Sequence, residues 1–297
     1  LVDLFHHRLT LPTNTQTVTL IGFGCVHADD PGFNEELWAE CVETIQKTPL
    51  CWAFGLGDYF TLARSHYRNH IRAYRQDEDS QREIDALVKD RARDFYRQYL
   101  KPLKGKLLGL AEGNHRWEFL NGTTSTQFLC ELADIPYWGY TSLHRLQFVH
   151  RLGSSIYVLK MLVHHGDWSA GGMTPGGDLN SLERRAEGWD TDITWVAHTH
   201  RKVAYVSPIM TIPETGKLQL VERPRVYIRA GCFVRGYMPG CTTYAERKLL
   251  KPTELGWVTL RIQSYQPRDP EKSAMKREQG SRGGAAGPVR YRFRVEH

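Results

Sequence analysis

The 297-residue chain has no long hydrophobic run and no closely spaced set of cysteines. No window approaches 18 consecutive apolar residues, which excludes a predicted membrane-spanning helix. The opening residues LVDLFHHRLT lack the basic-then-apolar order of a secretory signal, although the absence of an initial methionine leaves a removed signal open. The six cysteines are scattered along the chain, which favours reduced thiols. We therefore expect a cytoplasmic protein with no membrane association.

Strong charge of one sign is also missing. Lysine and arginine number 39 against 33 aspartates and glutamates, which gives a formal net charge of +6. This mild excess permits an anionic substrate without requiring one. Hydrophobic residues make up 41% and charged residues 24%, a balance typical of a globular chain with a sizeable core. The sequence contains no internal repeat.

Five short apolar runs end in a small residue followed by polar side chains, a pattern that indicates buried strands. They are TVTLIGFG (17–24), CWAFGLG (51–57), KLLGLAEG (106–113), SIYVLKMLV (155–163) and TDITWVA (191–197). Helical periodicity is present at 34–47, where Asn34 is a candidate N-cap, and at 81–101. Strands that alternate with helices predict a layered α/β core, with ligands at the strand ends.

The domain organisation predicted from these patterns is simple. We expect one domain over residues 1–265, with a helical insertion at about 59–104. Residues 266–288 are polar and rich in glycine, which predicts a flexible loop. Residues 289–297 then form a C-terminal strand, because VRYRFRV alternates apolar side chains with arginines that discourage further pairing at a sheet edge.

Metal-binding residue types follow each of the five predicted strands. In chain order they are Cys25 and His27, Asp58, Asn114 with His115, His164 with His165, and His198 with His200. Oxygen, nitrogen and sulfur donors together suit metal ions. A single pair of this kind occurs by chance in many proteins, but five in succession at strand ends predict a metal site.

This ordered set resembles the calcineurin-like metallophosphoesterase superfamily, whose pattern is DxH, GD, GNH, H and GHxH. The resemblance covers about residues 17–205, and the stretches YLKPLKGKLLGLAEGNHRWE and GCFVRGY resemble phage and bacterial members of uncertain substrate. It implies a four-layer αββα sandwich, in which two mixed β-sheets are flanked by helices and two metals lie at the strand ends.

Transferred residue by residue, the resemblance implies two ligand sets that share the carboxylate of Asp58. One ion would be bound by Cys25, His27, Asp58 and His200. The other would be bound by Asp58, Asn114, His165 and His198, with His165 preferred to His164 because it directly precedes Gly166. A carboxylate that bridges two ions fits a two-metal hydrolytic site.

The resemblance also implies roles around the metals. His115, next to a ligand, would protonate the leaving group or stabilise the transition state. Arg116 and Arg201 each follow a metal motif and are candidates to bind a substrate phosphate, and His164 is a candidate to line the site.

Two positions depart from the family pattern. Ala197 replaces the first glycine of GHxH, which is acceptable if the backbone there needs no positive φ. Cys25 replaces the aspartate of the first motif, and a thiolate suits zinc or iron better than manganese or magnesium. We expect two divalent or trivalent ions, with zinc or iron favoured and manganese possible. The alternative is that Cys25 is a buried thiol and only the second ion binds well.

The resulting functional prediction is hydrolysis of phosphate esters, phosphodiesters more readily than monoesters, by a metal-bridging hydroxide. The substrate remains open, with nucleotides and nucleic acids among the candidates, and so does the oligomeric state. One alternative is a catalytically impaired metal-binding scaffold. Another is a nucleic-acid-binding module that uses the arginine face of residues 289–295.

Overall fold

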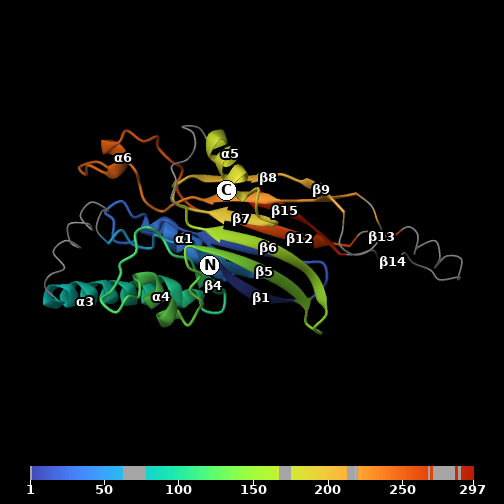
Figure 1. The fold of residues 1–297 in the computed structure, drawn as a ribbon, viewed down its shortest axis with the longest axis horizontal. Coiled ribbons are helices and arrows are strands. Elements are labelled where there is room, and N and C mark those ends of the chain that lie inside the picture. Colours follow the sequence, from blue (N-terminus) through green and yellow to red (C-terminus); the bar gives the residue numbers. More distant parts are fainter. Residues whose placement is uncertain are drawn as a thin grey trace, which may run out of the picture.

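The computed structural model describes residues 2–62, 78–166, 175–212, 218, 220–266, 268–269, 285–286 and 289–297. Two large mixed β-sheets dominate this part of the chain, and helices lie outside them (Figure 1). Among the described residues, no helix combines the length and apolar character that a membrane span requires.

The first sheet has five strands in the order β15-β12-β2-β3-β4. Their bounds are β2 Thr17–Phe23, β3 Cys51–Gly55, β4 Leu107–Leu110, β12 Val258–Tyr265 and β15 Arg290–Glu296. The parallel trio β2, β3 and β4 confirms the first three strands predicted from the sequence. The arginine-rich β15 is an edge strand that pairs antiparallel with β12, as its alternating pattern predicted.

The second sheet has six strands in the order β1-β5-β6-β7-β11-β8. Their bounds are β1 Asp3–Leu11, β5 Thr141–His150, β6 Ser155–His164, β7 Ile193–Val196, β8 Lys202–Val206 and β11 Val226–Ala230. The strands β6 and β7 were predicted, whereas β1, β5, β8 and β11 were not. Two short ladders, β9 Ile209–Thr211 with β10 Val221–Arg223 and β13 Arg268–Asp269 with β14 Ala285–Ala286, lie outside this sheet.

The helices cover the outer faces of the two sheets. The helices α1 Glu35–Lys47, α3 Glu78–Phe95 and α4 Ser125–Ala133 share one apolar core with the outward side chains Ile21, Phe23 and Ala53 of the first sheet. On the other side, Leu182 and Ala186 of α5, Pro175–Ala186, pack on Val196 and Tyr227 of the second sheet. A further core fills the space between the sheets. The predicted four-layer αββα sandwich is therefore confirmed.

The two predicted helices differ in how closely they match. Asn34 caps α1 as predicted, because its side chain accepts a hydrogen bond from the N–H of Leu37 at 3.4 Å. The second predicted helix, at 81–101, corresponds to α3, which begins earlier than predicted and ends at Phe95. A π-helical turn, Tyr96–Leu100, and a 3₁₀ turn, Lys101–Leu103, follow it, and a short helix α6, Tyr244–Arg247, comes later.

Two regions of the predicted domain organisation fall partly outside the described residues. The proposed insertion at 59–104 contains α3, but residues 63–77 are not described. Most of the predicted flexible loop at 266–288 is not described either, and the part that is forms β13 and β14. The domain boundaries drawn from the sequence remain predictions.

A glycine in β2 permits the close approach of the two sheets. A Cβ atom at Gly22 would lie 2.7 Å from the indole of Trp195 and 2.9 Å from the ring of Phe54. Both aromatic side chains are fully buried in the core between the sheets, and their rings meet edge to face with centroids 5.1 Å apart. Any side chain at this position would therefore push the sheets apart or displace Trp195.

We expect Gly22→Ala to lower the free energy of unfolding by about 1–3 kcal/mol, the usual cost of overpacking a core. Adding Trp195→Phe should recover part of this loss, because the two changes act on the same contact. Chemical denaturation measures both effects. Gly188→Ala is the matched control, since nothing lies within 4 Å of its added Cβ. Equal losses in Gly22→Ala and in the control would contradict the packing described here.

Two histidines pack against Trp138 of the inter-sheet core: His144 is buried and His7 is half-buried. The Nδ1 of His144 is 3.1 Å from the Nε2 of His7, and its Nε2 is 2.8 Å from the hydroxyl of Ser142. Burial lowers the pKa of His7 from 6.5 to about 4 and that of His144 to about 2. Between about pH 4 and pH 6.5, the folded state thus keeps both imidazoles neutral, whereas the unfolded chain protonates them.

The sign of the pH effect follows from the lowered pKa values. Stability from this pair is complete above about pH 6.5 and is lost as the pH falls towards the folded-state pKa values. In a His144→Gln variant, we expect the decline in unfolding free energy between pH 7 and 5 to be about 1–2 kcal/mol smaller than in the original chain. Denaturation of both metal-free proteins tests this, because the other histidines titrate in each. If the unfolding free energies of the two proteins decline equally between pH 7 and 5, this expectation is wrong.

Candidate metal centre

The strand ends hold their candidate ligands in an unusual backbone conformation. Five of the nine non-glycine residues with positive φ in the described part of the chain are candidate ligands: Cys25 (50°), His27 (49°), Asp58 (55°), His198 (68°) and His200 (57°). Such residues cost on the order of 1–3 kcal/mol each and cluster at functional sites. Hydrogen bonds between the strand-end loops stabilise them, among them Cys25 N–H to Gly57 O at 3.0 Å and His27 N–H to Asp58 O at 3.1 Å.

The first cluster consists of Cys25, His27 and His200. One ligand atom from each lies within 4.8 Å of the others. The Nε2 of His27 is buried and has no hydrogen-bond partner, and it faces the Oδ2 of Asp58 at 4.0 Å. A buried polar atom left without a partner is costly. A cation between these side chains would satisfy it, so the cluster fits a metal ion.

The second cluster consists of Asp58, His165 and His198, whose ligand atoms also lie within 4.8 Å of one another. The amide oxygen of Asn114 joins them, 2.9 Å from the Nε2 of His165 and 3.1 Å from the Nδ1 of His198. The Nδ1–H of His165 donates to the carbonyl of Leu56 at 2.6 Å, which turns the Nε2 towards Asp58 at 3.1 Å. Metal-binding histidines are commonly oriented by such a carbonyl.

The electrostatics of the two clusters suit a cation. Burial raises the pKa of Asp58, but His165, His115 and His27 outweigh it and hold the pKa well below its usual range. The Asp58 carboxylate in turn raises the pKa of His165 above its usual value despite burial. Burial lowers the pKa of His200 to about 4. At neutral pH the site therefore presents the carboxylate of Asp58 and the neutral imidazole of His200.

Cys25 is the exception, because burial and then the charge of Asp58 raise the pKa of its thiol well above the usual value. A thiolate at this position needs a positive charge beside it. A bound metal ion provides that charge and deprotonates a coordinating thiol. The same burial that keeps Cys25 inert without metal thus makes its ionisation dependent on the ion.

His115 lies at the edge of both clusters. Its backbone N–H donates to the Oδ1 of Asp58 at 2.8 Å, and its Nδ1 is 3.2 Å from the carbonyl oxygen of Thr61. Its ring meets the ring of His27 edge to face, with centroids 5.0 Å apart. The structure therefore places His115 beside the candidate ligands, outside both clusters.

Three further candidates lie outside the two clusters. The Nδ1 of His164 is 2.7 Å from the hydroxyl of Thr141, whereas the Nε2 of His165 is 3.1 Å from the Oδ2 of Asp58. The side chains of Arg116 and Arg201 are half-buried. Ala197 has no positive φ, so an alanine at this position requires no special backbone conformation.

Two buried groups that support the AHTH loop were not predicted from the sequence. Arg229 and Asp178 form a fully buried ion pair, with 2.7 Å between Nη2 and Oδ1. Arg229 also donates to the carbonyl of Ala197 at 3.3 Å, and the hydroxyl of Thr199 donates to Asp178 at 3.2 Å. An arginine inside the apolar run VYIRA is a usable signal, since a buried charge requires a partner.

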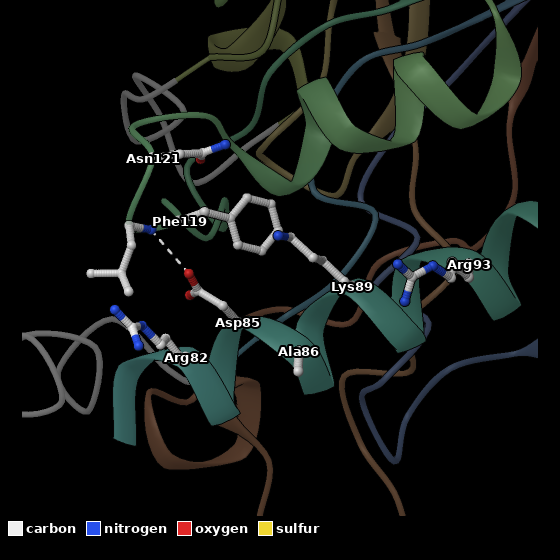
Figure 2. A pocket seen from close by; sticks show the side chains of 8 residues that line it. Arg82, Asp85, Ala86, Lys89, Arg93, Phe119 and Asn121 are labelled. Atoms are coloured by element: carbon white, nitrogen blue, oxygen red, sulfur yellow. Dashed lines mark hydrogen bonds between the residues drawn. The ribbon is translucent and has the colours of Figure 1, made fainter. Parts of the chain in front are cut away.

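The loop that follows Asn114 is tied to α3. Asp85 of α3 accepts a hydrogen bond from the indole N–H of Trp117 at 2.7 Å. It also accepts one from the backbone N–H of Leu120 at 2.9 Å, the dashed line in Figure 2. Beside this contact is a shallow pocket of about 320 Å³ with basic side chains on its rim, among them Arg82, Lys89 and Arg93. The pocket contains none of the candidate ligands.

No protein-family model matches this sequence, and no curated protein matches it. Among solved structures, the chain is similar to Vps29 of Entamoeba histolytica in complex with Zn²⁺ (9% identity, 94% of this chain and 99% of that one, TM-score 0.38). It is also similar to a predicted phosphoesterase of Streptococcus pneumoniae (12% identity, 94% of this chain and 99% of that one, TM-score 0.34). A third similar structure is a 5'-nucleotidase precursor of Thermus thermophilus (10% identity, 94% of this chain and 54% of that one, TM-score 0.33). The strand pairing and the layers of this chain itself define its αββα arrangement.

The fold and the two clusters define an αββα sandwich with candidate metal-binding side chains where its strands end. In each cluster the candidate ligand atoms come from loops that follow strands of both sheets.

Removing the first-cluster thiol tests whether it binds metal. We expect Cys25→Ala to lower the metal content by about one ion per chain, and Cys25→Asp to retain the ion while shifting preference from zinc or iron towards manganese. Elemental analysis of protein purified without chelators measures both. Cys41→Ala is the control, because Cys41 is an equally buried thiol in α1, away from the clusters. Unchanged content and preference in Cys25→Asp would show that Cys25 is not a ligand.

Proposed function

We propose that this protein hydrolyses phosphate esters, and phosphodiesters in particular, at a two-metal centre. The observation that carries the proposal is the position of one carboxylate oxygen. The Oδ2 of Asp58 lies 4.0 Å from the Nε2 of His27 in the first cluster and 3.1 Å from the Nε2 of His165 in the second. One carboxylate therefore faces both clusters, as a ligand shared by two ions must.

The residues that would bind the ions follow from this geometry. Cys25, His27, Asp58 and His200 would hold one ion, and Asp58, Asn114, His165 and His198 would hold the other. The thiol favours zinc or iron at the first position, while the oxygen and nitrogen donors of the second also accept manganese. Two such ions, when bound, supply a hydroxide nucleophile at neutral pH and neutralise the charge on the phosphoryl oxygens.

His115 acts as the proton donor in this proposal. When the bond between phosphorus and the leaving oxygen breaks, the departing alkoxide takes the proton from the Nε2 of His115, which solvent then reprotonates. Its Nδ1–H is occupied by the carbonyl of Thr61, so the Nε2 is the nitrogen turned to the substrate. Arg116, Arg201 and His164 complete the proposed substrate contacts, and nucleotides or nucleic acids are the substrate class we favour.

Cys25 also supports a second candidate, a metal-binding scaffold with impaired catalysis. Its raised pKa means that the first cluster binds metal only if the ion outcompetes a proton on a buried thiol. A nucleic-acid-binding role through β15 has less support, because the Nε of Arg292 is hydrogen-bonded to Gln263 at 2.9 Å and Arg294 lies 3.9 Å from Glu296. The free cysteines, five of them buried, fit the proposed reducing, cytoplasmic location.

Two substitutions separate catalysis from scaffolding. We expect His115→Ala to lower kcat/KM for a dinucleoside monophosphate, whose alkoxide leaving group needs a proton, by about 10²–10⁴-fold with unchanged metal content. Asn114→Ala should lower both activity and metal content, because it removes a ligand. Steady-state rates and elemental analysis on the same preparations measure these effects.

The control variant is His6→Ala. His6 is an exposed histidine on β1, so its removal should change neither the activity nor the metal content. Undiminished turnover in both active-site variants would mean that the activity does not belong to this site. Absence of turnover in the original chain, with two ions bound, would favour the scaffold.

A further inference from the structure

We propose that Thr61 and Asp29 form a positioning unit that orients the metal-ligand candidate His27 and the proton donor His115 together. Neither residue carries a metal-binding or catalytic role in the proposed function. The inference rests on that function for the role of His115, and on the geometry alone for the role of His27.

Thr61 contacts both histidines through different atoms. Its side-chain Oγ1 is 3.1 Å from the Nδ1 of His27, and its backbone carbonyl oxygen is 3.2 Å from the Nδ1 of His115. The rings of these two histidines lie edge to face, 5.0 Å between centroids. One residue thus holds the Nδ1 of each imidazole and leaves each Nε2 turned elsewhere.

The chemistry at each Nδ1 agrees with the role of the ring. A neutral His27 that binds metal through Nε2 carries its proton on Nδ1, and the Thr61 hydroxyl oxygen accepts it. His115 donates its Nδ1–H to the Thr61 carbonyl, which keeps the Nε2 available to the leaving group. Because the hydroxyl serves one histidine and the carbonyl the other, a side-chain substitution separates the two effects.

Asp29 fixes the backbone of Thr61. Its Oδ1 accepts a hydrogen bond from the Thr61 N–H, and its Oδ2 accepts from the N–H of Leu62 at 2.9 Å. Leu62 has a positive φ of 45°, a conformation that leucine rarely adopts and that these hydrogen bonds stabilise. The same Oδ2 is 3.3 Å from the Nη1 of Arg91, so Asp29 also connects this turn to α3.

The position of Asp29 in the chain adds a second link. It lies two residues after His27, and the backbone of this loop pairs with the Asp58 loop through Ala28 N–H to Tyr59 O at 2.9 Å. Loss of Asp29 would therefore release the Thr61 carbonyl and hydroxyl together. Loss of the Thr61 hydroxyl alone would affect only His27.

Zinc binding measures the orientation of His27 without any need for turnover. In a His198→Ala background, which weakens the second cluster, we expect Thr61→Val to lower Zn²⁺ affinity by about 10-fold or more, within the usual range for a residue that orients a ligand. Thr61→Ser should restore it, because the hydroxyl returns. Equal affinities in Thr61→Val and Thr61→Ser would overturn this half of the inference.

Leaving-group dependence measures the orientation of His115. The p-nitrophenolate of bis(p-nitrophenyl) phosphate departs without a proton, whereas the alkoxide of a dinucleoside monophosphate needs one. Relative to the original chain, we expect Asp29→Ala to lower kcat for the dinucleoside monophosphate at least 10-fold more than for the aryl ester. We expect Thr61→Val, which keeps its backbone carbonyl, to lower kcat for both esters by the same factor.

The neighbouring carboxylate provides the control. The side chain of Asp30 accepts a hydrogen bond from the N–H of Gly32 at 2.8 Å, and its backbone N–H donates to the carbonyl of His27 at 2.8 Å. Neither bond involves an imidazole ring and the backbone is kept in Asp30→Ala, so this variant should leave zinc affinity and the leaving-group ratio unchanged. If Asp29→Ala shows the same ratio as Asp30→Ala, the positioning of His115 is wrong. A chain that binds zinc as expected but hydrolyses neither ester would overturn the proposed function while the zinc titration still tests Thr61.

Discussion

The buried carboxylate of Asp58 is the group on which the rest of the centre depends. It is 4% exposed and follows a glycine of positive φ, and the hydroxyl of Tyr59 accepts a hydrogen bond from that glycine at 3.1 Å. One of its oxygens accepts the backbone N–H of His115, and the other faces His27 and His165. An isolated buried carboxylate is strongly disfavoured, so the folded chain needs these partners for its stability as well as for the metal site.

The strained strand ends show how the sandwich supports this charge. Side chains at positive φ project into the space between neighbouring loops, where the two clusters form. The cost of each strained residue is offset by packing elsewhere, such as the indole of Trp195 against Gly22. Rigid parallel strands behind irregular loops are a common way to hold functional groups in fixed positions.

Much of this arrangement could be predicted because its signals are local. A buried run, a glycine and a donor side chain are adjacent in sequence, so the strands ending near Cys25, Asp58 and His198 were identified. The strands β1 and β5 were missed because their outward positions carry histidine, arginine and glutamine, which break any apolar run. The role of Thr61 could not be predicted, since it depends on a backbone carbonyl that has no sequence signature.

Each cluster draws its side chains from both layers of the sandwich. Cys25 and His27 follow β2 in the first sheet, while His200 follows β7 in the second, and Asp58 likewise meets His165 and His198 across the interface. An ion bound in either cluster would therefore be a cross-link between the sheets, comparable to a disulfide between distant segments. Sliding of one sheet over the other would then require metal release. Metal binding and the stability of the packing between the sheets would therefore be thermodynamically coupled.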